Sequence, residues 1–350
     1  MVKRSNPARQ SEPRPSGSVR IIVTVRNRER SLTVAAPITH PKQSVVTEVN
    51  MLEVEIIERI RRLALLPRGG GLVLGIGDDC AICRPRGAAE DLLFTTDMLI
   101  EGVHFLPATH RPEDIGWKAL ARGLSDIAAM GGEPRFCLVS LALARKADGK
   151  WIDAFYRGLL RLARREGVVL IGGDLARGPH LMCDIVACGA VPRGQALRRS
   201  GARPGDAIFV SGALGGSAAG LARGAGRAWR RHLRPEPRLA LGRFLRRLGS
   251  TAAMDLSDGL SLDLHRLCCA SRVKAEISAP PIYPGATLRQ ALDGGEDYEL
   301  LFTAPPRVAV PPEFEGLPLT RIGTIRRGLP SVELDGAPLP PRGWDHFRRR

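Results

Sequence analysis

Apolar positions along the chain repeat with the period of a helix in some stretches and form short unbroken runs in others. The helical period starts near Val49, and its apolar positions are Leu52, Ile56, Ile60, Leu63 and Leu66. Pro67 and the glycines at 69–71 follow directly, and residues of these types end helices. We therefore expect the folded sequence to begin with an amphipathic helix close to residue 49.

Beyond this helix, short apolar runs alternate with amphipathic stretches over the rest of the chain. In the first half we expect strands at 72–76, 92–95, 136–143, 168–171 and 183–191, and helices at 114–130 and 151–165. In the second half we expect strands at 207–210, 298–303, 319–325 and 331–334, and helices at 214–223 and 238–248. Such alternation is typical of α/β proteins. The predicted fold class is α/β with mixed sheets.

A stretch rich in arginine, glycine and proline, residues 192–206, indicates a junction between two domains. The 350 residues are also more than one hydrophobic core usually holds. We therefore predict an N-terminal α/β domain at 48–195 and a C-terminal α/β domain at 200–350. Residues 1–47 carry nine Lys or Arg and two Glu among scattered Pro and Ser, which predicts a disordered basic extension.

The chain carries no feature of a membrane or exported protein. No apolar stretch approaches the ~18–20 residues that a membrane span needs. The basic start is followed by the short run 21–25, which is too short for a signal peptide. Seven cysteines, an odd number, suit reduced thiols, and Cys80 and Cys83 lack a second pair that would complete a zinc site. We therefore expect a cytoplasmic protein with no membrane partner.

The formal net charge of +16 first suggests a nucleic-acid partner. Lysine, however, occupies only six positions, so arginine supplies most of the 52 basic residues. Aromatic residues make up 5% of the chain, which leaves few surfaces on which bases could stack. We interpret the charge as a solvated basic surface that attracts anionic substrates, and we expect no nucleic-acid partner.

Aspartates stand at positions where a lone charge is costly. Those that follow apolar runs are Asp78, Asp79, Asp97, Asp174, Asp255 and Asp258, while Asp126 lies among apolar neighbours in the helix expected at 114–130. Loops that follow strands converge over one edge of an α/β sheet. A carboxylate beside apolar residues is unfavourable unless a cation or a donor meets it. Each Asp-Gly pair alone is typical of a turn, but the whole set predicts a cation site.

The ligand types in this set indicate magnesium. Carboxylates with flanking threonine hydroxyls, and no cluster of His and Cys, suit hard Mg²⁺ better than zinc. The neighbouring glycines allow turns whose backbone approaches phosphate groups. The sequence has no Walker A loop and no protein-kinase motif set. Any phosphoryl transfer is therefore expected to depend on metal ions rather than on a P-loop lysine.

Eight segments, taken in order, resemble those of the thiamine-monophosphate kinases, which belong to the aminoimidazole-ribonucleotide synthetase-like superfamily. They are GIGDDCAI (75–82), TTDMLIEGVHF (95–105), GWKALARGLSDIAAMGGEP (116–134), IGGDLARGP (171–179), RRSGARPGD (198–206), MDLSDGLSLDL (254–264), GGEDYELLF (294–302) and GWDHF (343–347). The resemblance implies the two-domain fold of that superfamily, with the metal and ATP site in the N-terminal domain. It also implies that ATP and thiamine monophosphate give ADP and thiamine diphosphate by direct in-line transfer assisted by several Mg²⁺ ions.

The resemblance further implies roles for individual residues. The metal ligands would be Asp79, Thr95, Thr96, Asp97, Asp126, Asp174, Asp255 and Asp258, among which Asp97, Asp126 and Asp258 would be catalytic. The ATP contacts would be Tyr156, Gly173, Arg199 and Ser257, and the contacts to thiamine monophosphate would be His104, Gly294, Glu296 and Phe347. The family also implies a homodimer that forms through the sheet of the N-terminal domain.

Two other functions remain open at the level of the sequence. One is another ATP-dependent enzyme of the superfamily, such as an aminoimidazole-ribonucleotide or selenophosphate synthetase. The other is a basic nucleic-acid-binding protein without catalysis, although the intact set of aspartates disfavours it. The stretch between Asp258 and Gly294 is shorter than we expect for the family. This difference affects the region before the predicted thiamine-monophosphate contacts rather than the predicted ATP contacts.

Overall fold

The computed structural model describes residues 22–27, 30–35, 52–64, 70–145 and 147–347. The chain divides into two compact units, Met1–Asn50 and Met51–Arg350. In the first unit, strands β1 (Ile22–Asn27) and β2 (Arg30–Ala35) pair antiparallel. Apart from this hairpin, the disorder predicted for residues 1–47 lies outside the described residues.

A six-stranded sheet forms the first half of the second unit. Its strands are β3 (Leu72–Leu74), β4 (Ala81–Cys83), β5 (Glu90–Ile100), β6 (Glu133–Leu143), β7 (Val169–Arg177) and β8 (Met182–Pro192). Their order across the sheet is β3-β4-β5-β8-β6-β7. Neighbouring strands are antiparallel, except that β6 and β7 are parallel. The sheet is therefore mixed, as the sequence predicts.

Three helices belong to this half: α1 (Glu53–Leu63), α2 (Pro112–Ala129) and α3 (Gly149–Glu166). Helix α2 packs on β5 and β8, and α3 packs along α2. The two helices approach closely because glycines face backbone atoms across the interface. A Cβ on Gly116 would lie 2.0 Å from the carbonyl oxygen of Phe155, and one on Gly158 would lie 1.8 Å from that of Glu113. Side chains at these two positions would separate the helices.

An eight-stranded sheet forms the second half. Its strands are β9 (Ala207–Ser211), β10 (Ala252–Asp255), β11 (Lys274–Ile277), β12 (Leu300–Ala304), β13 (Glu313–Phe314), β14 (Leu317–Arg326), β15 (Ser331–Leu334) and β16 (Ala337–Pro338). The order is β10-β12-β9-β14-β11-β15-β16, with β13 paired to β14. The helices are α4 (Gly216–Arg223), α5 (Gly226–Leu233), α6 (Leu239–Leu248), α7 (Leu260–Ser271) and α8 (Leu288–Asp293). This sheet is also mixed, since β11 and β15 run parallel.

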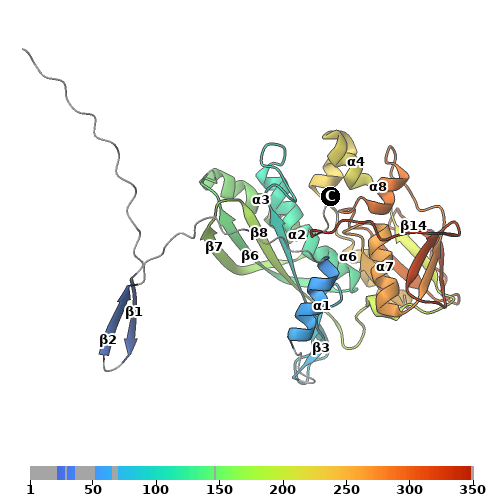
Figure 1. Cartoon of the computed structure of the whole chain (residues 1–350), viewed down its shortest axis with the longest axis horizontal. Helices are drawn as coiled ribbons and strands as arrows, with labels where there is room; N and C mark the ends of the chain where they lie inside the picture. The colour runs from blue at the N-terminus through green and yellow to red at the C-terminus, as the bar shows by residue number, and fades with distance from the viewer. Residues whose placement is uncertain (1–21, 28–29, 36–51, 65–69, 146, 348–350) are drawn as a thin grey trace, which may run out of the picture. The chain divides into compact units, whose positions relative to one another are not determined.

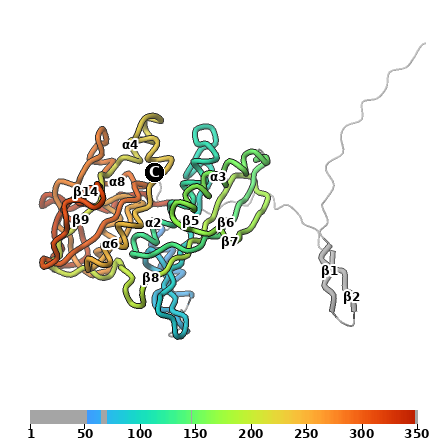
Figure 2. Tube along the Cα trace, turned by 180° about the vertical axis from the view of Figure 1, so that it is seen from behind, coloured from blue at the N-terminus to red at the C-terminus, as the bar shows by residue number. Residues whose placement is uncertain are grey.

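Helix α2 lies where the two halves meet (Figures 1 and 2). It contacts β5 and β8 of the first sheet, and β10 and α6 of the second half. One hydrophobic core continues across this seam, because Leu241 and Leu245 of α6 and Phe302 of β12 pack with the side chains of the first sheet. Within the described part of the chain, no helix combines the length and the apolar character that crossing a membrane requires.

Two of the sequence motifs lie within strands, although they were expected at strand ends. Strand β5 continues through Thr95, Thr96 and Asp97 because it pairs with β8 over its whole length. Strand β7 similarly continues through the Gly-Gly-Asp segment because β6 pairs with it as far as Arg177. The expected strand at 298–303 begins later, at Leu300, because Glu296 and Tyr298 have positive φ angles of 55° and 50°. These three boundaries were wrong, whereas the mixed α/β class is confirmed.

Candidate active site

Helix α2 places three functional side chains in one line. Lys118, Arg122 and Asp126 are four residues apart, so they lie on one helix face, each about 6 Å along the axis from the next. Lys118 is only 1% exposed, because α2 is covered by the sheet, by α3 and by α6. A line of two cations and one carboxylate therefore follows the seam between the halves.

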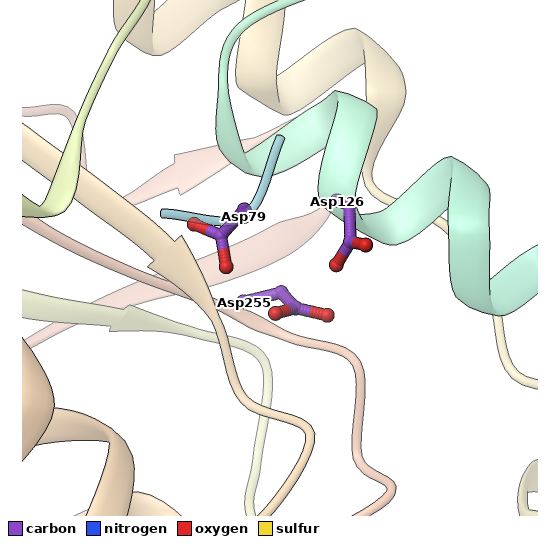
Figure 3. Close-up of side chains that lie close together, drawn as sticks. All are labelled: Asp79, Asp126 and Asp255. Atoms are coloured by element: carbon purple, nitrogen blue, oxygen red, sulfur yellow. The ribbon is translucent and has the colours of Figure 1, made fainter. Parts of the chain in front are cut away.

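Asp126 belongs to a cluster of three carboxylates that come from distant segments. Asp79 precedes β4, Asp126 lies within α2, and Asp255 is the last residue of β10. One oxygen of each lies within 4.8 Å of the others, and the three carboxylates point toward one another (Figure 3). The chain thus brings together three of the predicted metal ligands, two from the first half and one from the second.

The electrostatics of this cluster disfavour three full negative charges. Burial raises the pKa of Asp126 well above its usual value, and the charges of Asp97, Asp255 and Asp79 raise it further. Burial and the charge of Asp79 raise the pKa of Asp255 in the same direction. Next to the cluster, burial followed by the charge of Asp79 raises the pKa of Asp78 to about 7. Such shifts are expected where carboxylates are close together and poorly hydrated.

The donor set suits a hard divalent cation. Two hydroxyl groups donate to the cluster: Ser125 Oγ to Asp255 at 2.6 Å, and Thr95 Oγ1 to Asp126. Among the described residues, Asp79 Oδ2 is buried without a hydrogen-bond donor. A buried oxygen without a donor, beside two further carboxylates, is the arrangement that an oxygen-coordinated Mg²⁺ ion would satisfy. The residues therefore fit the metal predicted from the sequence.

Arg199, predicted to contact ATP, lies beside this cluster. Its guanidinium donates to Asp79, and its backbone N–H lies 3.2 Å from Asp78 Oδ2. Because arginine binds carboxylates and phosphates with the same fork of donors, this side chain stands where a phosphate group next to a bound cation would meet it.

Asp97 lies on the same face of β5 as Thr95 and faces Arg122. Arg122 Nη2 donates to Asp97 Oδ1 at 3.0 Å, and Nη1 donates to the carbonyl of Met98 at 3.2 Å. Burial raises the pKa of Asp97 although Arg122 opposes the shift. Asp97 therefore adjoins the cluster, because its charge is the strongest carboxylate contribution to the raised pKa of Asp126.

Asp258 is bound by another arginine, Arg266, which lies on α7. Arg266 donates to Asp258 and, at 3.1 Å, to Asp263, whose other oxygen accepts the backbone N–H groups of Asp258 and Gly259 at 3.0 Å. The charge of Asp258 contributes to the raised pKa of Asp97. The carbonyl of Ser257 accepts the N–H of Glu296 at 2.6 Å. This loop therefore connects the carboxylates to the segment predicted to bind the substrate.

Glu296 forms a buried ion pair with the first cation of the α2 line. Lys118 Nζ lies 2.8 Å from Glu296 Oε1, and His232 Nδ1 lies 3.3 Å from Oε2. Burial alone would raise the pKa of Glu296, but Lys118 and His232 lower it to about 2. Glu296 is therefore a fixed anion at the end of α2 opposite the carboxylate cluster.

His104 shares this neighbourhood with the C-terminal segment. Its ring centroid lies 5.1 Å from that of His346, and Nδ1 accepts the N–H of Ile100 at 3.0 Å. Burial, followed by the charge of Arg122, lowers the pKa of His104 to about 3, so the ring is neutral at physiological pH. Phe347 follows His346 and is 41% exposed, and its N–H donates to Asp345 at 2.9 Å.

Gly294, the remaining predicted substrate contact, is required by a close approach. A Cβ at this position would lie 2.3 Å from the carbonyl oxygen of Gln290. The glycine thus lets the chain turn from α8 into the loop that carries Glu296.

Four of the predicted metal and ATP ligands are not brought to the cluster by any described contact. Thr96 points to the opposite face of β5 from Thr95 and donates to Asp184 at 2.7 Å. Asp174 is exposed on the edge strand β7, opposite Ser140. Gly173 abuts the backbone of Val139, and Tyr156 is half-buried on α3 with its ring edge-on to Phe155. Their roles stay predictions.

Four further residues of the site were not predicted from the sequence: Lys118, Arg122, His232 and Arg266. A signal was present for the first two, because they precede Asp126 by eight and four residues on one helix face. His232 and Arg266 lie on α5 and α7, and nothing in their local sequence indicates which carboxylates they meet.

Comparisons with known proteins agree with this geometry. Residues 77–191 match the family model "AIR synthase related protein, N-terminal domain". The chain is 41% identical over 303 residues to the thiamine-monophosphate kinase of Salmonella typhimurium, covering 78% of this chain and 91% of the relative. The structure of AaThiL complexed with AMPPCP and TMP matches with a TM-score of 0.78 at 33% identity, covering 87% of this chain and all of that one. The thiamine-monophosphate kinase structure from Stenotrophomonas maltophilia K279a matches with a TM-score of 0.66 at 42% identity, covering 82% and 97%.

The two mixed sheets and the carboxylate cluster at their seam define a protein of the AIR-synthase-related class. Within that class, identity of about 40% extends over most of the chain rather than over one domain. The chain belongs to the thiamine-monophosphate kinase family.

Proposed function

We propose that this chain transfers the terminal phosphoryl group of ATP to thiamine monophosphate, which gives ADP and thiamine diphosphate. The observation that carries the proposal is the buried cluster of Asp79, Asp126 and Asp255 beside Arg199 and Arg122. The structure of AaThiL complexed with AMPPCP, an ATP analogue, and TMP supports the choice of both substrates. Family membership favours this reaction over those of the synthetases with a related fold.

Magnesium would be held by the cluster residues and by Asp97, with further ligands among the residues that the sequence predicts: Thr95, Thr96, Asp174 and Asp258. Bound there, Mg²⁺ would neutralise the charge of the transferring phosphate groups. Several carboxylates in one place suit several ions, because each ion needs about six oxygen ligands.

In the reaction, an oxygen of the acceptor phosphate attacks the γ-phosphorus of ATP in line, and the bond from that phosphorus to the β–γ bridging oxygen breaks. The acceptor oxygen is already anionic near neutral pH, so no strong general base is required. The work of the protein is therefore to position the two anions and to neutralise their charges. Arg199, Ser257, Gly173 and Tyr156 are proposed for ATP, and His104, Glu296, Gly294 and Phe347 for thiamine monophosphate.

We also propose that the chain forms a homodimer through the open face of the six-stranded sheet. On β5, the exposed Phe94 and Met98 alternate with Leu93 and Leu99, which are buried in the core that α2 covers. Phe136 of β6 adds a further exposed apolar side chain to this face, because Phe94 and Phe136 both pair with Cys188 of β8. Exposed apolar groups gathered in this way mark an interaction surface, and a second copy is the expected partner.

The cytoplasmic location stays a prediction.

Purified protein mixed with ATP, Mg²⁺ and thiamine monophosphate tests the proposed activity. We expect chromatography to show equimolar ADP and thiamine diphosphate, with neither product formed when EDTA is added. ADP released at the same rate without thiamine monophosphate would instead identify an ATPase or a different acceptor. Absence of the diphosphate at saturating substrates would overturn the proposal.

A further inference from the structure

We propose that Arg122 is a catalytic residue whose guanidinium stabilises the negative charge on the phosphoryl group as it passes from ATP to the acceptor. This inference rests on the function proposed above and assigns to a residue of α2 a part of the chemistry that metal ions alone would otherwise supply.

Arg122 lies in the middle of the line that Lys118, Arg122 and Asp126 form on α2. Arg122 is one helical turn from Asp126 of the carboxylate cluster and one turn, in the other direction, from Lys118, which holds Glu296. One end of this line thus lies at the predicted nucleotide and metal side, and the other at the predicted acceptor side. Both neighbours are about 6 Å away along the axis, so Arg122 lies midway between the two sides.

Anionic groups surround Arg122. Burial opposes its positive charge, but Tyr298, Asp97, Glu296 and Asp126 all favour it, which raises the pKa of Arg122 above its ordinary value. The carboxylates that contribute come from both sides of the site. Arg122 is thus a permanent cation that faces the nucleotide side and the acceptor side at once.

Two of the three guanidinium nitrogen atoms of Arg122 have acceptors among the described residues. Nη2 and Nη1 are bound to Asp97 and to the carbonyl of Met98, which fix the plane of the guanidinium. Nε is buried and has no acceptor among the described residues. Buried guanidinium N–H groups are normally paired, because leaving one without a partner is unfavourable. A phosphoryl oxygen beside Arg122 would supply the acceptor that this donor lacks.

The chemistry is that of a fixed charge in a phosphoryl transfer. The bond between the γ-phosphorus and the β–γ bridging oxygen breaks, a bond from the acceptor oxygen forms, and Arg122 gains or loses no proton. Negative charge accumulates on the three equatorial oxygens in the transition state, and an arginine placed there lowers the barrier. Because this interaction is stronger in the transition state than with either substrate, it raises kcat more than it lowers KM.

The test compares Arg122→Ala and Arg122→Lys with the wild type in steady-state kinetics. Arg122→Ala is expected to lower kcat by about 10²–10³-fold and to change the KM of each substrate by no more than about threefold. Arg122→Lys should fall between the two, because it keeps the charge but loses the planar fork. Added guanidinium ion should restore part of the activity of Arg122→Ala and none of that of an Asp97→Asn variant.

A binding experiment separates a catalytic role from a structural one. Calorimetry should show that Arg122→Ala binds AMPPCP with Mg²⁺ as the wild type does, but binds ADP, aluminium fluoride and thiamine monophosphate together at least tenfold more weakly. The control is Arg84→Ala, which removes an arginine–aspartate pair outside the site, Arg84 to Asp91 at 2.6 Å, and should leave both affinities and kcat unchanged.

Three results would overturn the inference. They are a kcat for Arg122→Ala within threefold of the wild type, an increase in kcat, or an equal loss of affinity for AMPPCP and for the aluminium fluoride complex. If the wild type produces thiamine diphosphate in the same assay, these results contradict the role of Arg122 and leave the proposed function unaffected. An inactive wild type would overturn the proposed function, and the assignment of Arg122 would fall with it.

Discussion

At the scale of single residues, the carboxylate cluster lowers the stability of the metal-free fold and provides the predicted metal ligands. Asp255 is 2% exposed and has a raised pKa, so the folded chain without metal favours its protonated form. A group whose folded pKa lies above its unfolded value stabilises the fold at low pH, and that contribution is lost as the pH rises through the folded pKa. Because the pKa of Asp78 is about 7, part of this stability is lost near neutral pH. The metal-free protein should therefore become less stable between about pH 5 and pH 8.

Replacing Asp255 by Asn is expected to stabilise the metal-free protein while abolishing phosphoryl transfer. The amide keeps an acceptor for the Ser125 hydroxyl and removes the charge that burial disfavours. At pH 8 in EDTA, Tm should rise by roughly 2–5 °C, and the rise should shrink at pH 5. Differential scanning calorimetry over this pH range measures the effect.

The control for this prediction is Asp91→Asn. Its partner Arg84 lowers the pKa of Asp91, so this carboxylate stabilises the fold when charged. Tm should fall in the control at pH 8. A fall for Asp255→Asn of similar size would contradict the assignment of repulsion within the cluster.

At the scale of elements, α2 is the component on which the site depends. It carries Lys118, Arg122 and Asp126 on one face, and it contacts both sheets. Its position against α3 is fixed by two contacts between glycine and backbone, at Gly116 and Gly158. A small displacement of this one helix would move all three side chains together.

Gly158→Ala is expected to lower the free energy of unfolding by about 1–3 kcal/mol, because the added methyl group would overlap the carbonyl of Glu113. It should also lower kcat, since α2 must shift. Urea unfolding monitored by circular dichroism, together with the kinase assay, measures both effects. Gly149→Ala is the control, because a Cβ there has no neighbour within 4 Å and Ala favours the helix. Equal stability for the two variants would contradict the packing argument.

How far the sequence predicts these elements depends on which interactions determine them. The periodicity at 151–165 predicts α3 (Gly149–Glu166) closely, because an amphipathic face is a local feature. The length of β5 (Glu90–Ile100) is set instead by its pairing with β8, some ninety residues later, and no local signal ends the strand at Asp97. The meeting of Asp79, Asp126 and Asp255 was predicted from their awkward positions beside apolar runs. The pairing of Lys118 with Glu296 across 178 residues was not predicted.

At the scale of the whole molecule, the site exists only where the two halves meet. Asp79 and Asp126 come from the first half and Asp255 from the second, while the ion pair of Lys118 and Glu296 crosses the same seam. A shared hydrophobic core holds the halves together beneath these polar contacts. The opposite face of the six-stranded sheet carries the exposed side chains of Phe94 and Met98, where the homodimer is proposed to form.

Met98→Asp is expected to shift the protein from dimer to monomer, because it places a charge in the middle of the exposed apolar surface of β5. Size-exclusion chromatography with light scattering measures the mass. The control is Leu329→Asp, which changes a side chain that is 86% exposed in the turn between β14 and β15 and should leave the mass unchanged. A wild-type protein that elutes as a monomer at micromolar concentration would contradict the proposed dimer.

The placement of the three carboxylates on both sides of the seam has a consequence for how the two halves are held together. A cation bound by ligands from both halves would stabilise the seam, since separating the halves would release the ion. Without the ion, the seam would lose the stabilisation that cation binding supplies, so the affinity for the metal would also set how firmly the two halves hold together.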